Sequence, residues 1–381
     1  MIYFDNAATG GYKPNSVLNK VFYTLKNLNA NAGRSGHKLS KIGAEIIYEA
    51  RKKLSAFFNN EQVDRVVFTK NCSEALNIAI YGLVKHGDHV ITTVTEHNSV
   101  LRPLYTLQQN GVIQLSIVKP YNKTFITKTD IKSAFKQNTK LVVVNYASNV
   151  TGTVNDISGI GHFLKNTNAT FLVDGTQASG HIKIDMKNSN IDALSVAGHK
   201  GLYAIQGIGA LIFNEKTQIL DTFQGGTGTE TFSALQPTCY PERLEYGTLN
   251  LPAISSLLEG VKYVEKGVHI IAQKLLADTS FLINALKEID GVKVYSNKNE
   301  CGIVSFSVEN TPSSEVSEIL SSKYDICVRG GFHCAPLMHE FLNSKEEGLT
   351  RVSLCPHNTR EEIYAFIKAV KEIAGKNSTF L

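Results

Sequence analysis

Short apolar runs alternate with amphipathic stretches along the middle of the chain. Six of these runs are predicted to be strands, at residues 66–68, 89–94, 141–144, 170–173, 193–197 and 210–213. Their valines, leucines and isoleucines follow one another without strict alternation, which indicates strands buried on both faces of a sheet. Residues 75–83 place alanine, leucine and isoleucine at helical spacing between the first two runs. Strands that alternate with helices predict a mostly parallel, doubly wound α/β sheet, whose ligands bind at the carboxyl ends of the strands.

Beyond about residue 250 the pattern changes to longer helices mixed with strands. Helices are predicted at residues 254–266, 270–286 and 314–322, and strands at residues 291–295, 303–308, 326–329 and 350–354. Thr359 and Glu362 have the spacing of a capping box, which predicts the start of a last helix. We therefore predict a large domain at residues 15–250 and a smaller α+β domain that combines residues 1–14 with residues 251–381.

The composition is that of a globular protein, since 43% of the 381 residues are hydrophobic and 19% are charged. The net charge of +5 is spread along the chain without a basic arm, so nucleic acid is not expected as a partner. No apolar run reaches membrane-spanning length and the N-terminus lacks an export signal, so we expect a cytoplasmic protein without a membrane partner. The six cysteines show neither C-x-x-C nor metal-ligand spacing, so we predict no disulfide framework and no metal site.

A carboxylate and an amine follow two of the predicted strands. Asp174 comes directly after residues 170–173, and Lys200 ends the segment Gly198-His199-Lys200 after residues 193–197. Both groups are costly at the ends of buried strands unless a ligand needs them. Pyridoxal 5′-phosphate (PLP) needs both, because its aldehyde forms a Schiff base with a lysine and its ring nitrogen stays protonated beside a carboxylate. For either residue alone, an ordinary strand-end aspartate or a solvated surface lysine remains the simpler interpretation.

Further polar residues follow other predicted strands. Cys72 and Ser73 begin a helix after residues 66–68, where free N–H groups and the helix dipole can bind a phosphate. His97 follows residues 89–94 and could stack on a cofactor ring, whereas Asn149 and Gln177 could hydrogen-bond a substrate or the ring. Each residue also has an ordinary interpretation, as a helix cap, a structural histidine or a turn residue.

One cysteine lies in a segment of unusual composition, Arg329-Gly330-Gly331-Phe332-His333-Cys334-Ala335-Pro336. Its glycines indicate a mobile hinge, and we expect the imidazole of His333 or His97 to keep the thiol of Cys334 ionised. The cysteines at 239, 301, 327 and 355 are expected to be buried small apolar side chains. Arg351, in the predicted strand at 350–354, offers a planar guanidinium that binds an α-carboxylate in two places, although in isolation a surface ion pair is the simpler interpretation.

Taken together, these stretches resemble the class V aminotransferase family of fold-type I PLP enzymes. Within that family the resemblance is closest to the cysteine desulfurases and selenocysteine lyases, and it extends over nearly the whole chain. Its most specific pieces are Asn31-Ala32-Gly33-Arg34-Ser35-Gly36-His37, Thr95-Glu96-His97-Asn98-Ser99, Asp174-Gly175-Thr176-Gln177, Gly198-His199-Lys200, Arg329-Gly330-Gly331-Phe332-His333-Cys334-Ala335 and Arg351-Val352-Ser353.

The resemblance implies a set of cofactor contacts. Lys200 would form the Schiff base, Asp174 would pair with the ring nitrogen, and Gln177 would bind the ring hydroxyl. His97 would stack on the ring and assist catalysis as an acid or base. Sites of this family form at a homodimer interface, so the residues expected around the phosphate are Cys72, Ser73 and His199 of one subunit with Thr227 and Thr229 of its neighbour.

On the substrate side, the resemblance implies that Asn149 and Arg351 orient the carboxylate and that Cys334 accepts the sulfur. Two positions depart from the family pattern. Ala197 stands where the family usually has a serine that helps to hold the phosphate, and Phe332 stands where the nearest subgroup commonly has histidine. The short loop suits a separate sulfur-acceptor protein, whose identity Phe332 leaves open.

We therefore predict a PLP-dependent cysteine desulfurase that converts L-cysteine to L-alanine and leaves a persulfide on Cys334 for transfer to an acceptor protein. The alternatives are a selenocysteine lyase that acts on L-selenocysteine, and a class V transaminase, which would have little use for a cysteine on a glycine-hinged loop. A non-catalytic sulfur carrier on the same frame is a further interpretation, but it has no reason to keep Asp174, Gln177 and Lys200.

Overall fold

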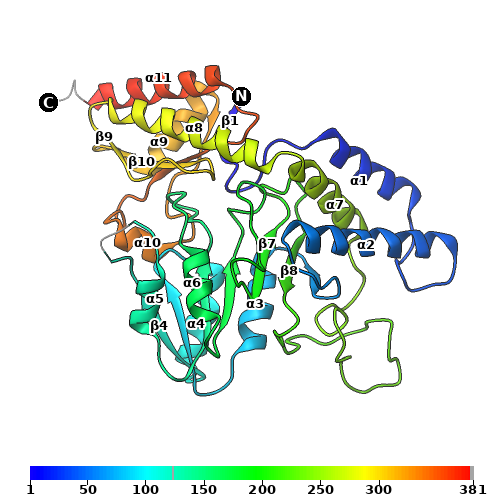
Figure 1. The fold of residues 1–381 in the computed structure, drawn as a ribbon. Coiled ribbons are helices and arrows are strands. Elements are labelled where there is room, and N and C mark those ends of the chain that lie inside the picture. Colours follow the sequence, from blue (N-terminus) through cyan, green and yellow to red (C-terminus); the bar gives the residue numbers. More distant parts are fainter. Residues whose placement is uncertain (122–123, 378–381) are drawn as a thin grey trace.

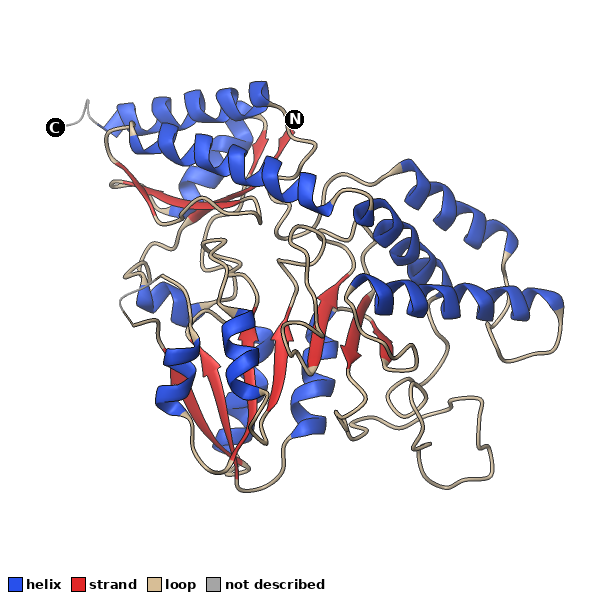
Figure 2. Ribbon diagram, viewed as in Figure 1, coloured by secondary structure: helices blue, strands red, loops and turns tan. Residues whose placement is uncertain are grey.

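A seven-stranded sheet forms the centre of the large domain (Figures 1 and 2). The computed structural model describes residues 1–121 and 124–377 and orders the strands β2-β8-β7-β6-β5-β3-β4. Neighbouring strands are parallel except for β8, which runs antiparallel to both β2 and β7. The strands are β2 (Val66–Thr69), β3 (Asp88–Thr93), β4 (Ile113–Val118), β5 (Thr139–Asn145), β6 (Thr170–Asp174), β7 (Ala193–Ala197) and β8 (Gly209–Phe213). The predicted mostly parallel sheet is confirmed.

Helices cover both faces of this sheet, as its apolar strands require. α3 (Cys72–Leu83) and α4 (Asn98–Gln109) pack on one face, against residues such as Val143 and Leu172. α2 (Lys38–Phe57), α5 (Lys128–Ala134) and α6 (Ile157–Leu164) pack on the other face, against Val142 and Phe171. Successive strand residues therefore enter two different apolar cores, which explains the continuous apolar runs. Within residues 1–121 and 124–377, none of the helices is long and apolar enough to cross a membrane.

The strand order brings the carboxyl ends of several strands to one edge of the sheet. Asn145 at the end of β5 pairs in register with Asp174 at the end of β6, and Asp174 pairs with Ser195 near the end of β7. α3 begins three residues after β2, and α4 begins five residues after β3. Because β2, β3, β5, β6 and β7 all point the same way, the residues that follow them can line one site.

α7 (Leu251–Glu265) packs against α1 (Asn15–Asn27) and α2, and the three helices lie together on one side of Figure 1. Its Leu257, Leu258 and Val261 belong to the same apolar core as the large sheet. The predicted boundary at residue 250 places α7 in the small domain, whereas this packing places it in the large one. α8 (Val268–Lys287) is the first helix after it whose apolar residues enter the small-domain core.

The small domain combines a three-stranded antiparallel sheet, ordered β12-β10-β9, with α8 and further helices. β1 (Ile2–Tyr3) pairs in parallel with β11 (Ile326–Cys327), which ties the N-terminal segment to this domain. The capping box at Thr359 is confirmed, because its N–H donates to Glu362 Oε2 at 3.0 Å and the Glu362 N–H donates to its Oγ1 at 3.2 Å. The remaining elements are β9 (Val292–Val294), β10 (Ile303–Val308), α9 (Ser313–Tyr324), α10 (Pro336–Phe341), β12 (Thr350–Ser353) and α11 (Arg360–Asn377).

Candidate active site

A single cavity at the carboxyl ends of the strands collects most of the predicted site residues. Its lining also includes Asn145, the last residue of β5, and Thr176, two residues after the end of β6. The predicted residues that line it are Cys72, Ser73, His97, Asn149, Asp174, Gln177, His199 and Lys200. Residues from five separate segments of the sequence therefore face one small volume.

Lys200 follows β7 and is partly buried in this cavity. Burial lowers the pKa of Lys200 from 10.5 to about 8, and the charge of Arg351 lowers it further, whereas Asp174 opposes the shift. A larger fraction of the side chain is therefore the neutral amine near neutral pH, which is the form that attacks an aldehyde.

Asp174 is buried, with one carboxylate oxygen already bound by the protein. Its Oδ1 accepts from the Thr176 N–H at 2.9 Å and from the Cys72 thiol at 3.6 Å. Within the described part of the chain, no donor is bound to Oδ2. One oxygen is thus held in place while the other is available to a protonated ring nitrogen.

The side chain of Cys72 points to Asp174 and not to a phosphate. Thr176 Oγ1 donates to its sulfur at 2.8 Å, and burial raises the pKa of Cys72, so the thiol stays protonated. The expectation that Cys72 holds the phosphate therefore has to be restricted to its backbone. The first N–H groups of a helix have no partner within the helix, and in α3 these include Cys72 and Ser73.

Gln177 leaves a buried acceptor without a partner. Its Nε2 donates to the carbonyl of Ala7 at 3.2 Å, while its Oε1 is buried and unpaired among the described residues. Such an orphaned oxygen is costly unless a ligand supplies a donor. A ring hydroxyl would supply that donor, and together with Lys200 and Asp174 this set of groups fits PLP.

His97 caps α4 and is neutral. Its Nδ1 accepts from the Ser99 N–H at 3.0 Å, so the ring proton lies on Nε2. Burial lowers the pKa of His97 from 6.5 to about 4, and the charge of Lys200 also lowers it, although Asp174 opposes the shift. Ser99 has no predicted role, yet its Oγ lies 2.9 Å from His97 Nδ1 and 2.6 Å from Ser73 Oγ. It thus connects the predicted ring-stacking histidine to the predicted phosphate site.

His199 precedes Lys200 and is also neutral. Burial lowers the pKa of His199 from 6.5 to about 4, and the charge of Lys200 contributes to this shift. Its Nδ1 lies 3.1 Å from Thr9 Oγ1, and its carbonyl accepts from the Gly10 N–H at 2.9 Å. The N-terminal segment therefore runs directly beside the Schiff-base candidate.

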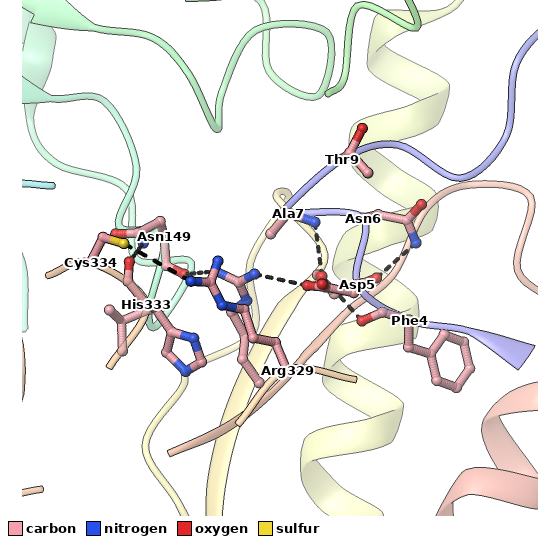
Figure 3. A network of polar contacts seen from close by, with 12 residues as sticks. Phe4, Asp5, Asn6, Ala7, Thr9, Asn149, Arg329, His333 and Cys334 are labelled. Carbon is pink, nitrogen blue, oxygen red and sulfur yellow. Dashed lines mark hydrogen bonds and ion pairs between the residues drawn. The ribbon is translucent and has the colours of Figure 1, made fainter. Parts of the chain in front are cut away.

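Arg351 lies beside this cavity, in β12 of the small domain, and is almost fully buried. Its Nη1 donates to the carbonyl of Asn149 at 3.0 Å, and its Nη2 donates to Asp5 Oδ1 at 2.9 Å. Figure 3 shows Asp5 on the N-terminal segment at one end of this network, and Asn149 and Cys334 at the other. Burial lowers the pKa of Arg351 from its usual value, and the charge of Asp5 is the main opposing cause.

Cys334 is exposed on a loop that is pinned to the large domain (Figure 3). Its carbonyl accepts from the Asn98 N–H at 2.7 Å, and the carbonyl of His333 accepts from Asn149 Nδ2 at 2.6 Å. His333 and Cys334 both have left-handed backbone angles, with φ of 50° and 57°. The structure therefore holds the loop by hydrogen bonds to the carbonyls of His333 and Cys334, and the expected mobility of this glycine-containing loop stays a prediction.

The charged neighbour of the Cys334 thiol is an arginine and not an imidazole. Arg329 Nη2 lies 3.9 Å from its sulfur. His333 is buried, its Nε2 donates to the carbonyl of Leu349 at 3.0 Å, and burial lowers its pKa well below the usual value. A neutral histidine cannot stabilise a thiolate through charge, which argues against the expected function of His333, and the positive charge beside the sulfur belongs to Arg329.

The chain matches a family model described as aminotransferase class-V over residues 2–366. The chain belongs to the class V aminotransferase family. A probable cysteine desulfurase of Methanothermobacter thermautotrophicus is 33% identical to it over 390 residues, which cover 98% of this chain and 95% of the relative. A probable cysteine desulfurase of Pyrococcus abyssi is 32% identical and covers 98% of this chain, with 94% of its own length matched.

Solved structures agree with this family assignment. The apo structure of a cysteine desulfurase from Thermococcus onnurineus has a TM-score of 0.92 and 30% sequence identity, and the match covers 98% of this chain and 95% of the other. A cysteine desulfurase of Escherichia coli has a TM-score of 0.88 at 22% identity, covers 97% of this chain with 94% of its own, and supports the fold alone. The predicted family and fold class are confirmed.

Two residues predicted to contact the phosphate of the neighbouring subunit lie outside the cavity of their own chain. Thr227 and Thr229 belong to the long loop between β8 and α7, where their Oγ1 atoms are 3.2 Å apart and Thr229 is exposed. Arg34 anchors the loop by donating to the carbonyl of Gly226 at 3.1 Å. A single chain does not bring them to Lys200, and their contribution across a homodimer remains a prediction.

The cysteines also separate by exposure. Cys72, Cys301 and Cys355 are buried and Cys327 is partly buried, whereas Cys239 and Cys334 are exposed. The expected burial of Cys239 is wrong, because it lies in the exposed loop that carries Thr227. Exposure alone therefore does not single out Cys334, but its position beside Asn149 and Arg329 does.

Proposed function

We propose that this chain is a PLP-dependent cysteine desulfurase that acts on L-cysteine and carries the sulfur as a persulfide on Cys334. One observation supports it above all. Asn149 lines the cofactor cavity, accepts from Arg351 through its carbonyl and holds the Cys334 loop through its amide. A single residue thus joins the predicted cofactor, carboxylate and thiol positions, as a desulfurase requires.

The cavity residues would hold the cofactor and prepare it for chemistry. PLP bound in this cavity would draw electrons from the α-carbon of a substrate whose amine has displaced Lys200, and this would weaken the bond between the β-carbon and the sulfur. Asp174 would keep the ring nitrogen protonated through its free Oδ2, and the unpaired Oε1 of Gln177 would accept from the ring hydroxyl. Lys200 would accept the α-proton as a neutral amine, because its pKa is lowered to about 8.

Cys334 would complete the reaction by attacking the sulfur of the substrate. The new sulfur–sulfur bond forms as the carbon–sulfur bond breaks, so that L-cysteine and one enzyme thiol give L-alanine and one enzyme persulfide. Arg329, 3.9 Å from Cys334 Sγ, would stabilise the negative charge of the attacking sulfur. The exposed position of Cys334 leaves the persulfide open to an acceptor protein.

The Cys334→Ala variant tests this proposal. It should retain the yellow colour of the bound cofactor but lose formation of alanine and persulfide from L-cysteine. Cys239→Ala is a matched control, because Cys239 is the other exposed cysteine of the described chain and lies on a different loop. Sulfide release from L-cysteine at the normal rate by Cys334→Ala would refute the assignment of the nucleophile.

A selenocysteine lyase is the second candidate, because it would use the same cofactor site. The weaker carbon–selenium bond needs the thiol less, so a lyase would retain activity on L-selenocysteine in Cys334→Ala. Side-by-side assays of both substrates therefore separate the two functions. A homodimer and a separate sulfur-acceptor protein complete the proposal and rest on the sequence resemblance, and a cytoplasmic location is expected from the sequence pattern.

A further inference from the structure

Arg351 has both terminal nitrogens bound by the protein itself. Nη2 donates to Asp5 Oδ1 at 2.9 Å and Nη1 donates to the carbonyl of Asn149 at 3.0 Å. The side chain of Arg351 is only 1% exposed, and its Nε is buried without a partner among the described residues. A substrate carboxylate therefore meets no exposed edge of this guanidinium. An arginine placed to bind a carboxylate already holds one from its own chain.

The backbone around Asp5 is fixed, while its side chain has room to turn. Asp5 bridges Ser353 in β12, and the two following residues also bind Ser353, through Asn6 Nδ2 to its carbonyl at 2.8 Å and through the Ala7 N–H to its Oγ at 2.9 Å. The Asp5 side chain itself is 22% exposed. A rotation of this side chain into solvent would therefore free Arg351 Nη2 without moving the N-terminal segment. Figure 3 shows Asp5, Asn6 and Ala7 on that segment.

We propose that Asp5 is an internal competitor for the substrate carboxylate on Arg351, and so a positioning residue that sets the affinity for L-cysteine. The inference rests on the proposed function, in which Arg351 binds the α-carboxylate. Without substrate, Asp5 neutralises a buried guanidinium that would otherwise carry an uncompensated charge, which is strongly unfavourable. When substrate enters, its carboxylate replaces that of Asp5, and the charge around Arg351 stays balanced.

This exchange also favours substrates that carry a carboxylate. An amine without one cannot replace Asp5, because the buried charge of Arg351 would then lose its only anionic partner among the described residues. The affinity for L-cysteine is accordingly the difference between two carboxylate interactions with the same guanidinium. Removing the internal carboxylate should strengthen the binding of substrate, whereas a residue that merely orients Arg351 would weaken binding when removed.

The test compares the PLP-loaded wild type with Asp5→Asn. The variant should lower the KM for L-cysteine about tenfold, the effect of about 1.4 kcal/mol of lost competition, with a smaller change in kcat. The dissociation constant of L-alanine, followed through the visible spectrum of the cofactor, should fall by a similar factor. Cysteamine, which is L-cysteine without the carboxylate, should bind both proteins equally. Asp5→Glu retains the carboxylate and should remain close to the wild type.

An unchanged or raised KM and dissociation constant in Asp5→Asn would overturn the inference. If this variant does not fold, Asp5→Ser removes the same charge and must show the same tightening. Arg351→Met separates a failure of the proposed competition from a failure of the proposed function. Weaker binding of L-cysteine to Arg351→Met without tighter binding to Asp5→Asn refutes only the competition, whereas unaltered binding to Arg351→Met refutes the carboxylate site itself.

Discussion

The lowered pKa of Lys200 predicts the pH at which the cofactor-free protein captures PLP. Only the neutral amine attacks the aldehyde, and the pKa of Lys200 is lowered from 10.5 to about 8. At pH 7 the neutral fraction is then about one tenth, against about one in three thousand for an ordinary lysine, a gain of about 300-fold. The capture rate should therefore rise about tenfold for each pH unit below 8 and become constant above it.

The neighbours of Lys200 set the direction in which variants move this curve. Arg351 lowers the pKa of Lys200 and Asp174 raises it. Arg351→Met should therefore shift the inflection to higher pH, and Asp174→Asn should shift it to lower pH. Rapid mixing of cofactor-free protein with PLP, followed by visible absorbance, measures the rate, and Lys200→Ala supplies the background from other lysines.

Two outcomes would contradict the argument. A wild-type inflection near the ordinary lysine value would show that burial does not favour the neutral amine. The same inflection in Arg351→Met and in the wild type would show that the guanidinium does not act on Lys200. A parallel titration of PLP with a free lysine derivative in the same buffers controls for ionisation of PLP itself.

Two further predictions concern charges outside the cofactor cavity. Arg329→Gln should slow alkylation of Cys334 by iodoacetamide about fivefold at low salt, because a charge about 4 Å away in water stabilises a thiolate by about 1 kcal/mol. The effect should be smaller at high salt, which screens this charge. Equal rates for the variant and the wild type at low salt would exclude Arg329 as the activating charge. Glu245→Gln should lower the free energy of unfolding in urea by about 3 kcal/mol, because it leaves Arg51 charged and buried, both side chains being 8% exposed. The more exposed ion pair of Glu265 with Lys53 is the matched control. Glu265→Gln should lower the free energy of unfolding by less than about 1 kcal/mol.

Local signals predict the large sheet and the residues at its strand ends. Continuous apolar runs report burial on two faces, and β7 has the predicted bounds, as does β10 in the small domain. Asp174 ends β6 and Lys200 lies three residues beyond the end of β7, so their meeting in one cavity follows from the shared direction of these strands. β4 is not among the predicted strands, because its apolar pattern is broken: Ile113 and Val118 are buried, whereas Gln114 is exposed.

Contacts that depend on side-chain direction could not be predicted in this way. Asp5 and Arg351 are 346 residues apart in the sequence, and they meet because the N-terminal segment pairs with β12 at Ser353. The turn of Cys72 toward Asp174 depends on where α3 begins relative to β6, and a helix-start pattern does not give that rotation. The predicted boundary at residue 250 assigns α7 to the small domain for a similar reason, because its apolar face would suit the core of either domain.

The Cys334 loop shows that residue composition can point to a loop without predicting its conformation. Its glycines predict a hinge, and Gly331 does have a positive φ of 111°, but His333 and Cys334 also have left-handed angles, which cost about 1 kcal/mol or more each. Hydrogen bonds from Asn98 and Asn149 to the carbonyls of these two residues oppose that cost. A flexible loop would need neither the strained angles nor the bonds that maintain them. These contacts hold the thiol at one position between the cavity and the surface, and under the proposed function sulfur would be transferred to an acceptor from that position.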